Sequence, residues 1–191
     1  MPHSSSIEFV DKEGQAILLQ VARAAVVSAS EGRRYEIPDV DNKSLLEPGA
    51  AFVTLTSHGH LRGCIGSLEA RQSLVRDVAD NAIAAATRDP RFPPVSPAEV
   101  SGLHIEISVL TPPEEMTFSS EGDLLRQIRP GIDGLVFEEG WRRGTFLPLV
   151  WQQLPGKEEF LAHLKQKAGL PSHYWSDTVR VFRYQTQVFE E

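Results

Sequence analysis

Residues 103–110, LHIEISVL, alternate apolar and polar side chains without a break as far as Val109. Successive side chains of a β-strand point to opposite faces, so the odd-numbered residues from Leu103 to Val109 share one face. His104 and Glu106 then lie on the other face. This pattern predicts a strand of an antiparallel sheet, with one face on an apolar core and the other face polar.

The remaining elements alternate irregularly between helix and strand. Amphipathic helices are predicted over about 11–30, 73–88 and 158–168, with short helices near 44–46 and 120–128. Strands are predicted over 51–56, 61–68, 133–139 and 143–147, and over a closing run from 179 to 189. Several strands are joined by hairpin-length loops and no regular βαβ repeat occurs. The sequence therefore predicts an α+β fold, a mostly antiparallel sheet with flanking helices, formed by 1–191 as one domain.

Charge and cysteine content narrow the classes of function. The formal charge of −7 argues against broad binding to phosphate backbones, so nucleic acid is not the expected partner. No apolar run approaches the roughly 18 residues of a membrane span, and the first 14 residues lack the features of a secretory signal. The single cysteine excludes an internal disulfide and an iron–sulfur motif. A cytoplasmic location is expected.

That cysteine, Cys64, lies in the predicted strand 61–68, within LRGCIG. Leu61 and Ile65 are expected to face the core, which leaves Arg62 and Cys64 together on the opposite face. A guanidinium close to a thiol favours the thiolate, the reactive form of cysteine. In one interpretation Cys64 is a nucleophile, and Arg62 activates it or holds an anionic group.

The two glycines beside Cys64 fit this interpretation and also a simpler one. Gly63 and Gly66 would either leave space for a ligand or allow another part of the backbone to approach closely. A free cysteine is more often a small buried hydrophobe than a catalyst, and no general base is fixed by spacing. Both interpretations stay open at the level of the residues.

Other residues could complete a site. His60 has the same strand parity as Cys64, and Glu106 is a candidate proton-transfer group, although a solvated sheet face would also explain it. Asp89, Arg91 and Phe92 follow the second long helix in a rigid, proline-rich loop, where they would bind a ligand or form a surface ion pair. No metal site is predicted, since the histidines lack HxxxH or HExxH spacing, and no cofactor is predicted either.

Five motifs in order resemble those of the AMMECR domain family, named after a human chromosomal region. They are LRGCIGSL at 61–68, DPRFPPV at 89–95, IEISVLTPPEEM at 105–116, GTFLPLVW at 144–151 and KAGLPSHYW at 167–175. The resemblance covers about residues 10–190, and LRGCIG is its hallmark. One departure is Leu149, where many relatives carry glutamine.

The resemblance implies a larger and a smaller lobe, with the hallmark segment near a cleft between them. It implies no established activity. Many members are associated with a Memo-type protein and a radical S-adenosylmethionine enzyme, which are the partners it suggests, together with an unknown small molecule. It marks as site residues Arg62, Gly63, Cys64, Gly66, Asp89, Arg91, Phe92 and Glu106.

Three hypotheses follow. In the first, the chain is an enzyme or enzyme component that uses Cys64 as a nucleophile or covalent carrier, with Arg62 and Glu106 assisting. In the second, it is a non-catalytic adaptor that docks a protein or small ligand. The third is nucleic-acid binding through a local basic patch, which the net charge disfavours.

Overall fold

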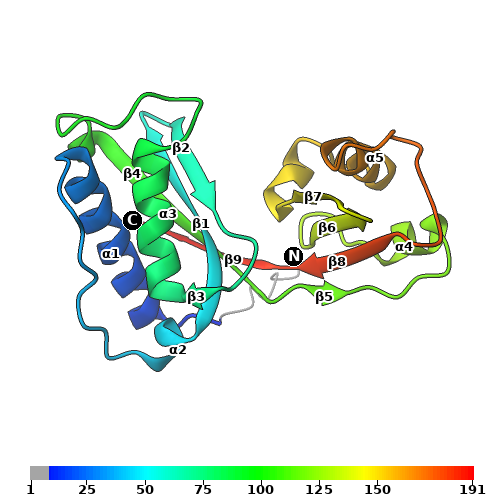
Figure 1. The fold of residues 1–191 in the computed structure, drawn as a ribbon, viewed down its shortest axis with the longest axis horizontal. Helices are drawn as coiled ribbons and strands as arrows, with labels where there is room; N and C mark the ends of the chain where they lie inside the picture. The colour runs from blue at the N-terminus through cyan, green and yellow to red at the C-terminus, as the bar shows by residue number, and fades with distance from the viewer. Residues whose placement is uncertain (1–8) are drawn as a thin grey trace, which may run out of the picture. The chain divides into compact units, whose positions relative to one another are not determined.

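The computed structural model describes residues 9–191, so most of the N-terminal segment used to argue against a secretory signal lies outside the described residues. The chain divides into two compact units (Figure 1). The first unit comprises residues 1–110 and 187–191, and the second comprises residues 111–186. Each unit has its own sheet and its own apolar core.

The sheet of the first unit is built around its longest strand. Its strands are β1 (Pro48–Ser57), β2 (His60–Gly66), β3 (Gln72–Ser73), β4 (Leu103–Leu110) and β9 (Thr186–Glu190). The order is β2-β1-β4-β9, and β3 pairs with the start of β1. β1 runs antiparallel to β2, β3 and β4, which places β2 at an edge of the sheet.

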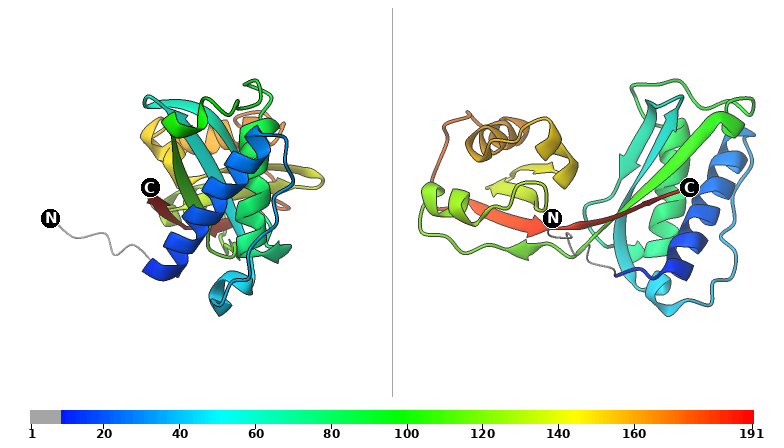
Figure 2. Two further views of the ribbon diagram at one scale, coloured as in Figure 1. Left: turned by 90° about the vertical axis from the view of Figure 1, so that its left-hand side faces the viewer. Right: turned by 180° about the vertical axis from the view of Figure 1, so that it is seen from behind.

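Two helices pack against one face of this sheet (Figure 2). They are α1 (Lys12–Ser30) and α3 (Leu74–Thr87), accompanied by the short α2 (Lys43–Leu46) and the 3₁₀ turn η1 (Val100–Gly102). The odd-numbered residues of β1 and β4, such as Leu55 and Ile105, are buried against the helices. The even-numbered residues, such as Thr54 and Glu106, are half-buried on the other face. The alternation predicted for residues 103–110 is therefore confirmed.

Two buried polar residues of α3 tie the helix to the sheet. Asp77 is only 2% exposed and accepts hydrogen bonds from the backbone N–H of Ala51 at 2.9 Å and from the Ser67 hydroxyl at 2.7 Å. Asn81, one turn along α3, donates to the Ala51 carbonyl at 3.1 Å. Asn81 is a polar residue on the buried face of this helix, and its amide satisfies a β1 backbone carbonyl inside the core.

The second unit has a four-stranded sheet, in which every pair of neighbours is antiparallel. Its strands, in the order β5-β8-β6-β7, are β5 (Glu114–Glu115), β8 (Arg180–Tyr184), β6 (Gly134–Glu139) and β7 (Arg142–Phe146). Its helices are α4 (Glu121–Gln127), the 3₁₀ segment η2 (Pro148–Gln152) and α5 (Lys157–Lys167). At the centre of its core, Trp151 stacks on Phe160 with ring centroids 3.7 Å apart.

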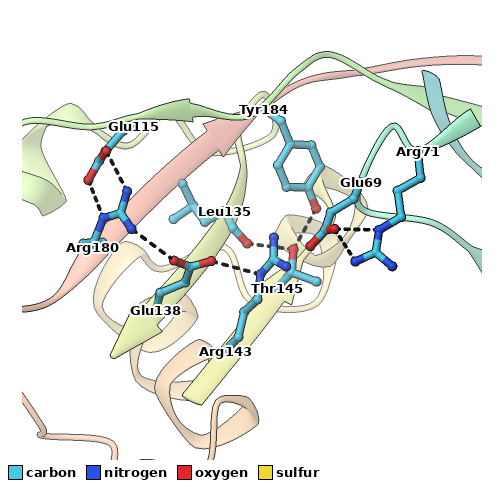
Figure 3. Close-up of polar contacts among 9 residues, drawn as sticks. All are labelled: Glu69, Arg71, Glu115, Leu135, Glu138, Arg143, Thr145, Arg180 and Tyr184. Carbon is cyan, nitrogen blue, oxygen red and sulfur yellow. Dashed lines mark hydrogen bonds and ion pairs between the residues drawn. The ribbon is translucent and has the colours of Figure 1, made fainter. Parts of the chain in front are cut away.

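Charged side chains of alternating sign cross all four strands of this second sheet (Figure 3). Arg180 of β8 contacts Glu115 of β5 at 2.7 Å and Glu138 of β6 at 3.8 Å. Arg143 of β7 contacts the same Glu138 at 3.2 Å. Opposite charges on neighbouring strands support the observed register, because a one-residue shift of any of these strands would move its charged side chain to the other face.

The closing run, predicted as one strand from 179 to 189, is two strands in two different sheets, and that prediction is wrong. The break falls at Gln185, between β8 and β9. Its backbone N–H donates to the Thr111 hydroxyl and its carbonyl accepts from the Thr111 N–H, both at 2.8 Å. Local composition does not reveal the break, since both halves are rich in strand-forming residues. The predicted α+β class with antiparallel sheets is confirmed.

Candidate functional site

The edge strand β2 contains a β-bulge. Leu55 pairs with Gly63 and Thr56 pairs with Leu61, so Arg62 is an extra residue without a partner on β1. An extra residue reverses the alternation of side chains beyond it. Leu61 is consequently 41% exposed and shares the face of Thr56, which makes the prediction that it faces the core wrong.

The bulge leaves the placement of Cys64 unchanged, because Cys64 lies on its far side. Thr54 pairs with Cys64 on one flank and with Glu106 on the other, so the three residues form a row across β2, β1 and β4. The row lies on the face of the sheet opposite α1 and α3. The Thr54 hydroxyl donates a hydrogen bond to the Cys64 Sγ at 3.3 Å. Cys64 and Glu106 therefore share the polar face as expected, roughly 10 Å apart across two strand spacings.

Arg62 does not contact the thiol. Its guanidinium binds Glu99 through Nε at 2.9 Å, donates to the Pro93 carbonyl at 3.0 Å and is only 13% exposed. The Arg62 hydrogen bond, together with bonds from Ser96, lowers the pKa of Glu99 to about 2. The expectation that Arg62 lies beside Cys64 is wrong, since the bulge turns the arginine toward the loop that follows α3.

Asp89 joins that loop to Cys64. Its carboxylate is nearly inaccessible and accepts the backbone N–H of Cys64 at 2.9 Å. It also accepts from Arg91 through Nε at 2.9 Å and through Nη2 at 2.6 Å. The Arg91 hydrogen bond is the main reason that the pKa of Asp89 lies well below its usual range. Asp89 thus gives an edge-strand N–H a partner and fixes the position of Arg91.

Arg91 is the cation associated with Cys64. One of its Nη2 donors reaches the Cys64 carbonyl at 3.4 Å, and its side chain is 53% exposed. The pKa of Arg91 is raised, chiefly by its hydrogen bond with Asp89. The Phe92 ring lies 5.5 Å from the Arg91 guanidinium and 5.9 Å from that of Arg62. All three predicted loop residues, Asp89, Arg91 and Phe92, therefore gather against β2.

Protein atoms fill the space beside both glycines of LRGCIG. A Cβ on Gly63 would lie 2.2 Å from the Ala85 carbonyl oxygen of α3, and one on Gly66 would lie 2.2 Å from the Phe52 ring. Gly63 is required because the edge strand touches a helix backbone, and Gly66 because an aromatic ring covers it. The space expected for a ligand is absent here, and the binding role assigned to these glycines stays a prediction.

The register of the sheet places His104, and not His60, on the face of Cys64. His60 pairs with Ser57 at the end of β2. The prediction that it shares the face of Cys64 is wrong, because the bulge lies between the two residues. His104 pairs with Thr56, directly beside the row of Cys64, Thr54 and Glu106. Its Nε2 lies 3.0 Å from a carboxylate oxygen of Glu190. His104, which the strand alternation of β4 placed on this face, is the nearer candidate for proton transfer.

Glu106 has the surroundings of a carboxyl group that tends to hold its proton. Burial raises its pKa, the negative charge of Glu190 raises it further, and His104 opposes these effects. Residues 9–191 provide no hydrogen bond to its carboxylate. A carboxyl group with a raised pKa can act as a general acid or base.

Sequence reasoning missed two residues of this arrangement. Thr54 belongs to an apolar run of β1, and only the register shows that it lies between Cys64 and Glu106. Glu99 follows the proline-rich loop, and no local pattern pairs it with Arg62 across 37 positions. Long-range partners of this kind depend on how β2 and the loop pack in three dimensions.

No helix within residues 9–191 has the length and apolar character needed to cross a bilayer. The same residues contain no group of three or more histidine, cysteine, aspartate or glutamate side chains arranged to hold a metal ion.

Known proteins resemble this chain over nearly its whole length. A protein of Methanothermobacter thermautotrophicus is 42% identical over 177 residues, 91% of this chain and 92% of that protein. A protein of Thermotoga maritima is 42% identical over 73% of this chain and 76% of its own length. The crystal structure of uncharacterized protein PH0010 from Pyrococcus horikoshii matches with a TM-score of 0.86 at 37% identity, over 96% of this chain and 94% of that one. The AMMECR1 sequence profile matches residues 19–189, and the chain belongs to the AMMECR1 family.

Proposed function

We propose that this chain is a thiol-dependent enzyme, or the thiol-bearing component of one, with Cys64 as its nucleophile. The observation that carries the proposal is the hydrogen bond from the Thr54 hydroxyl to the Cys64 Sγ, in a row that continues to Glu106. A hydrogen bond donated to the charged form of an acid favours that form. Thr54 therefore places a hydroxyl donor at the Sγ atom, where negative charge is carried when cysteine acts as a nucleophile.

The free donors of Arg91 favour a substrate with an anionic group. Asp89 occupies its Nε and Nη2, while its Nη1 makes no hydrogen bond with residues 9–191. A half-exposed guanidinium that is fixed on one side can present its remaining donors to a carboxylate or phosphate. The proposed substrate is a small anionic molecule with an electrophilic carbon, bound so that this carbon meets Sγ.

Glu106 and His104 supply proton transfer in this scheme. Attack by the Cys64 thiolate on a carbonyl carbon forms a carbon–sulfur bond and moves an electron pair to the carbonyl oxygen or to a leaving group. Glu106, whose pKa is raised by burial, would deliver the proton that this group takes up. His104 lies on the same face of the sheet and would restore the proton to Glu106.

We further propose that the chain acts with a Memo-type protein and a radical S-adenosylmethionine enzyme. This rests on the family resemblance alone. The test is co-purification of the tagged full chain, followed by metabolite profiling of cells that carry wild type, Cys64→Ser or Leu46→Ala, the last being an exposed surface control. The proposal expects Cys64→Ser to keep its partners and to accumulate a substrate that neither wild type nor the control accumulates.

The alternative is an adaptor without chemistry of its own. It predicts the same co-purification, with metabolite levels in Cys64→Ser cells equal to those of wild type. The two functions therefore differ in one readout of one experiment, and equal metabolite levels would favour the adaptor.

A further inference from the structure

We propose that the chain self-associates by inserting Trp141 of one copy into an acidic-rimmed apolar groove on the first unit of a second copy. Trp141 and Arg142 are here named the hairpin tip, and the groove between α1 and residues 35–41 is named the α1 groove. The proposal is independent of any reaction at Cys64.

Trp141 is the most exposed large apolar side chain of the described residues, at 87%. It occupies the second position of the two-residue turn between β6 and β7, and Gly140 at the first position has a φ of +59°. Glycine with positive φ there is typical of a tight hairpin turn, so the indole is held on a rigid support. Trp151 is buried in the core of the second unit and Trp175 packs against that core. Trp141 belongs to neither group.

Arg142 gives the hairpin tip a positive charge. Its guanidinium lies 5.2 Å from the centroid of the Trp141 ring, in a cation–π contact. Within the part of the chain that the structure describes, it forms no ion pair. Tryptophan and arginine are among the residues most enriched at the energetic centres of protein interfaces. The hairpin tip thus presents an aromatic anchor beside an unneutralised cation.

The α1 groove has the complementary chemistry. It has a volume of about 330 Å³ and is lined mainly by apolar groups, including Val21, Tyr35 and Val40. Asp39 and Asp41 stand at its rim, both exposed and neither paired with any of residues 9–191. This volume is near the lower limit of ligand pockets, which suits one aromatic side chain. The two carboxylates would neutralise Arg142.

A second groove shows that this match is selective. It has about 290 Å³, lies across Tyr35 from the α1 groove, and contains Arg34 and Arg76. Those arginines would repel Arg142. The net negative charge of both units disfavours an anionic lipid surface or nucleic acid as the partner. The first unit carries 10 basic and 16 acidic residues, a formal charge of −6, whereas the second carries 9 and 10, a formal charge of −1.

The proposed contact joins two different surfaces, so it can close reciprocally in a dimer or continue into a longer chain of copies. One anchor and one ion-pair cluster form a small interface, which predicts weak, concentration-dependent association. Sedimentation velocity from about 1 μM to about 1 mM covers the range of affinities expected for such contacts.

The variants are surface substitutions, whose folding is checked by thermal unfolding. Trp141→Ala is expected to weaken association about 30-fold, as for an interface hot spot, whereas Leu46→Ala, another exposed apolar residue, leaves it unchanged. Arg142→Asp should abolish association, as should Asp39→Lys with Asp41→Lys. The protein that combines all three charge reversals should regain it, because the charges are again opposite.

Trp141 fluorescence gives a second readout. The emission of wild type should move to shorter wavelength as concentration rises, and that of Trp141→Phe should not, because the indole enters an apolar groove only in the assembly. Dimers and longer assemblies both support the proposal if they require the hairpin tip and the α1 groove together. A monomer over the whole range, Trp141→Ala assembling like wild type, or a failure of the combined charge reversal to restore assembly would overturn it.

Discussion

Asp89 binds the backbone of Cys64: a buried carboxylate oxygen accepts the Cys64 N–H at 2.9 Å, and the same carboxylate holds Arg91. The outward-facing N–H of an edge strand is thereby satisfied within the protein. The candidate nucleophile and its nearest cation are positioned by one side chain, which comes from the loop after α3. The DPRF and RGC motifs, 25 positions apart, form one structural unit.

Replacing Asp89 should destabilise the first unit. Asp89→Ala leaves the Cys64 N–H and the Arg91 guanidinium without their acceptor, and we expect the free energy of unfolding to fall by about 2–3 kcal/mol. Asp89→Asn keeps an acceptor for the N–H and should lose about 1 kcal/mol. Urea unfolding measures both, with Glu158→Ala on the exposed face of α5 as the control. Equal losses for the alanine and asparagine variants would show that the N–H bond is unimportant.

Gly63 should be the least replaceable residue of the LRGCIG segment. A methyl group there would overlap the Ala85 carbonyl oxygen of α3, and backbone cannot move as a flexible side chain can. We expect Gly63→Ala to lose about 3 kcal/mol of stability through overpacking. Gly102→Ala is the matched control, because no atom lies within 4 Å of its added methyl group and its φ is not positive. If the two variants are equally stable, the close approach of β2 to α3 is not as described.

The fold was predictable where side-chain periodicity is local. Residues 103–110 form β4 at the predicted bounds, and the first helix, predicted over about 11–30, is observed at Lys12–Ser30. The alternation of side chains gave the wrong face for Leu61, because a bulge adds one residue to the strand and leaves no local mark in composition. Cys64 and Glu106 were placed on the same face, yet Thr54 between them was invisible without the register of three strands.

The Arg62–Glu99 pair should make stability depend on acid pH. The folded-state pKa of Glu99 is about 2, against an ordinary value of 4.5. Its contribution to stability is therefore fully present above about pH 4.5 and is lost as the pH falls toward 2. Thermal unfolding of wild type and Glu99→Gln between pH 2 and 6 measures this contribution as the difference between two curves, which should converge at low pH. A constant difference across the range would contradict it.

Asp77 should have the opposite effect on the pH dependence of stability. Burial raises its pKa in the folded protein, so the folded state takes up a proton more readily than the unfolded chain does. Its favourable contribution is present at low pH and is lost as the pH rises through the raised pKa. In Asp77→Asn this loss should disappear, and the stability of the variant relative to wild type should increase with pH. A relative stability that falls with rising pH would contradict the sign.

The negative charge of Glu190 should help to hold the pKa of Glu106 above its ordinary value. Burial is the main cause of the raised pKa of Glu106, and Glu190 adds to it. Glu190→Gln should therefore lower the pKa of Glu106 without returning it to its ordinary value, which carboxyl NMR titration can measure. Glu158→Gln serves as a remote control. A pKa of Glu106 that is unchanged by Glu190→Gln would remove Glu190 from the proposed site.

The rate of alkylation of Cys64 by iodoacetamide near neutral pH measures the reactivity of its thiol. Since Cys64 is the only cysteine, every adduct reports on it. If Cys64 is a nucleophile, wild type should react faster than free cysteine. Thr54→Val should react about tenfold more slowly, while Thr54→Ser, which keeps the hydroxyl, should react like wild type. A wild-type thiol slower than free cysteine, or one indifferent to Thr54→Val, would contradict an activated nucleophile at this position.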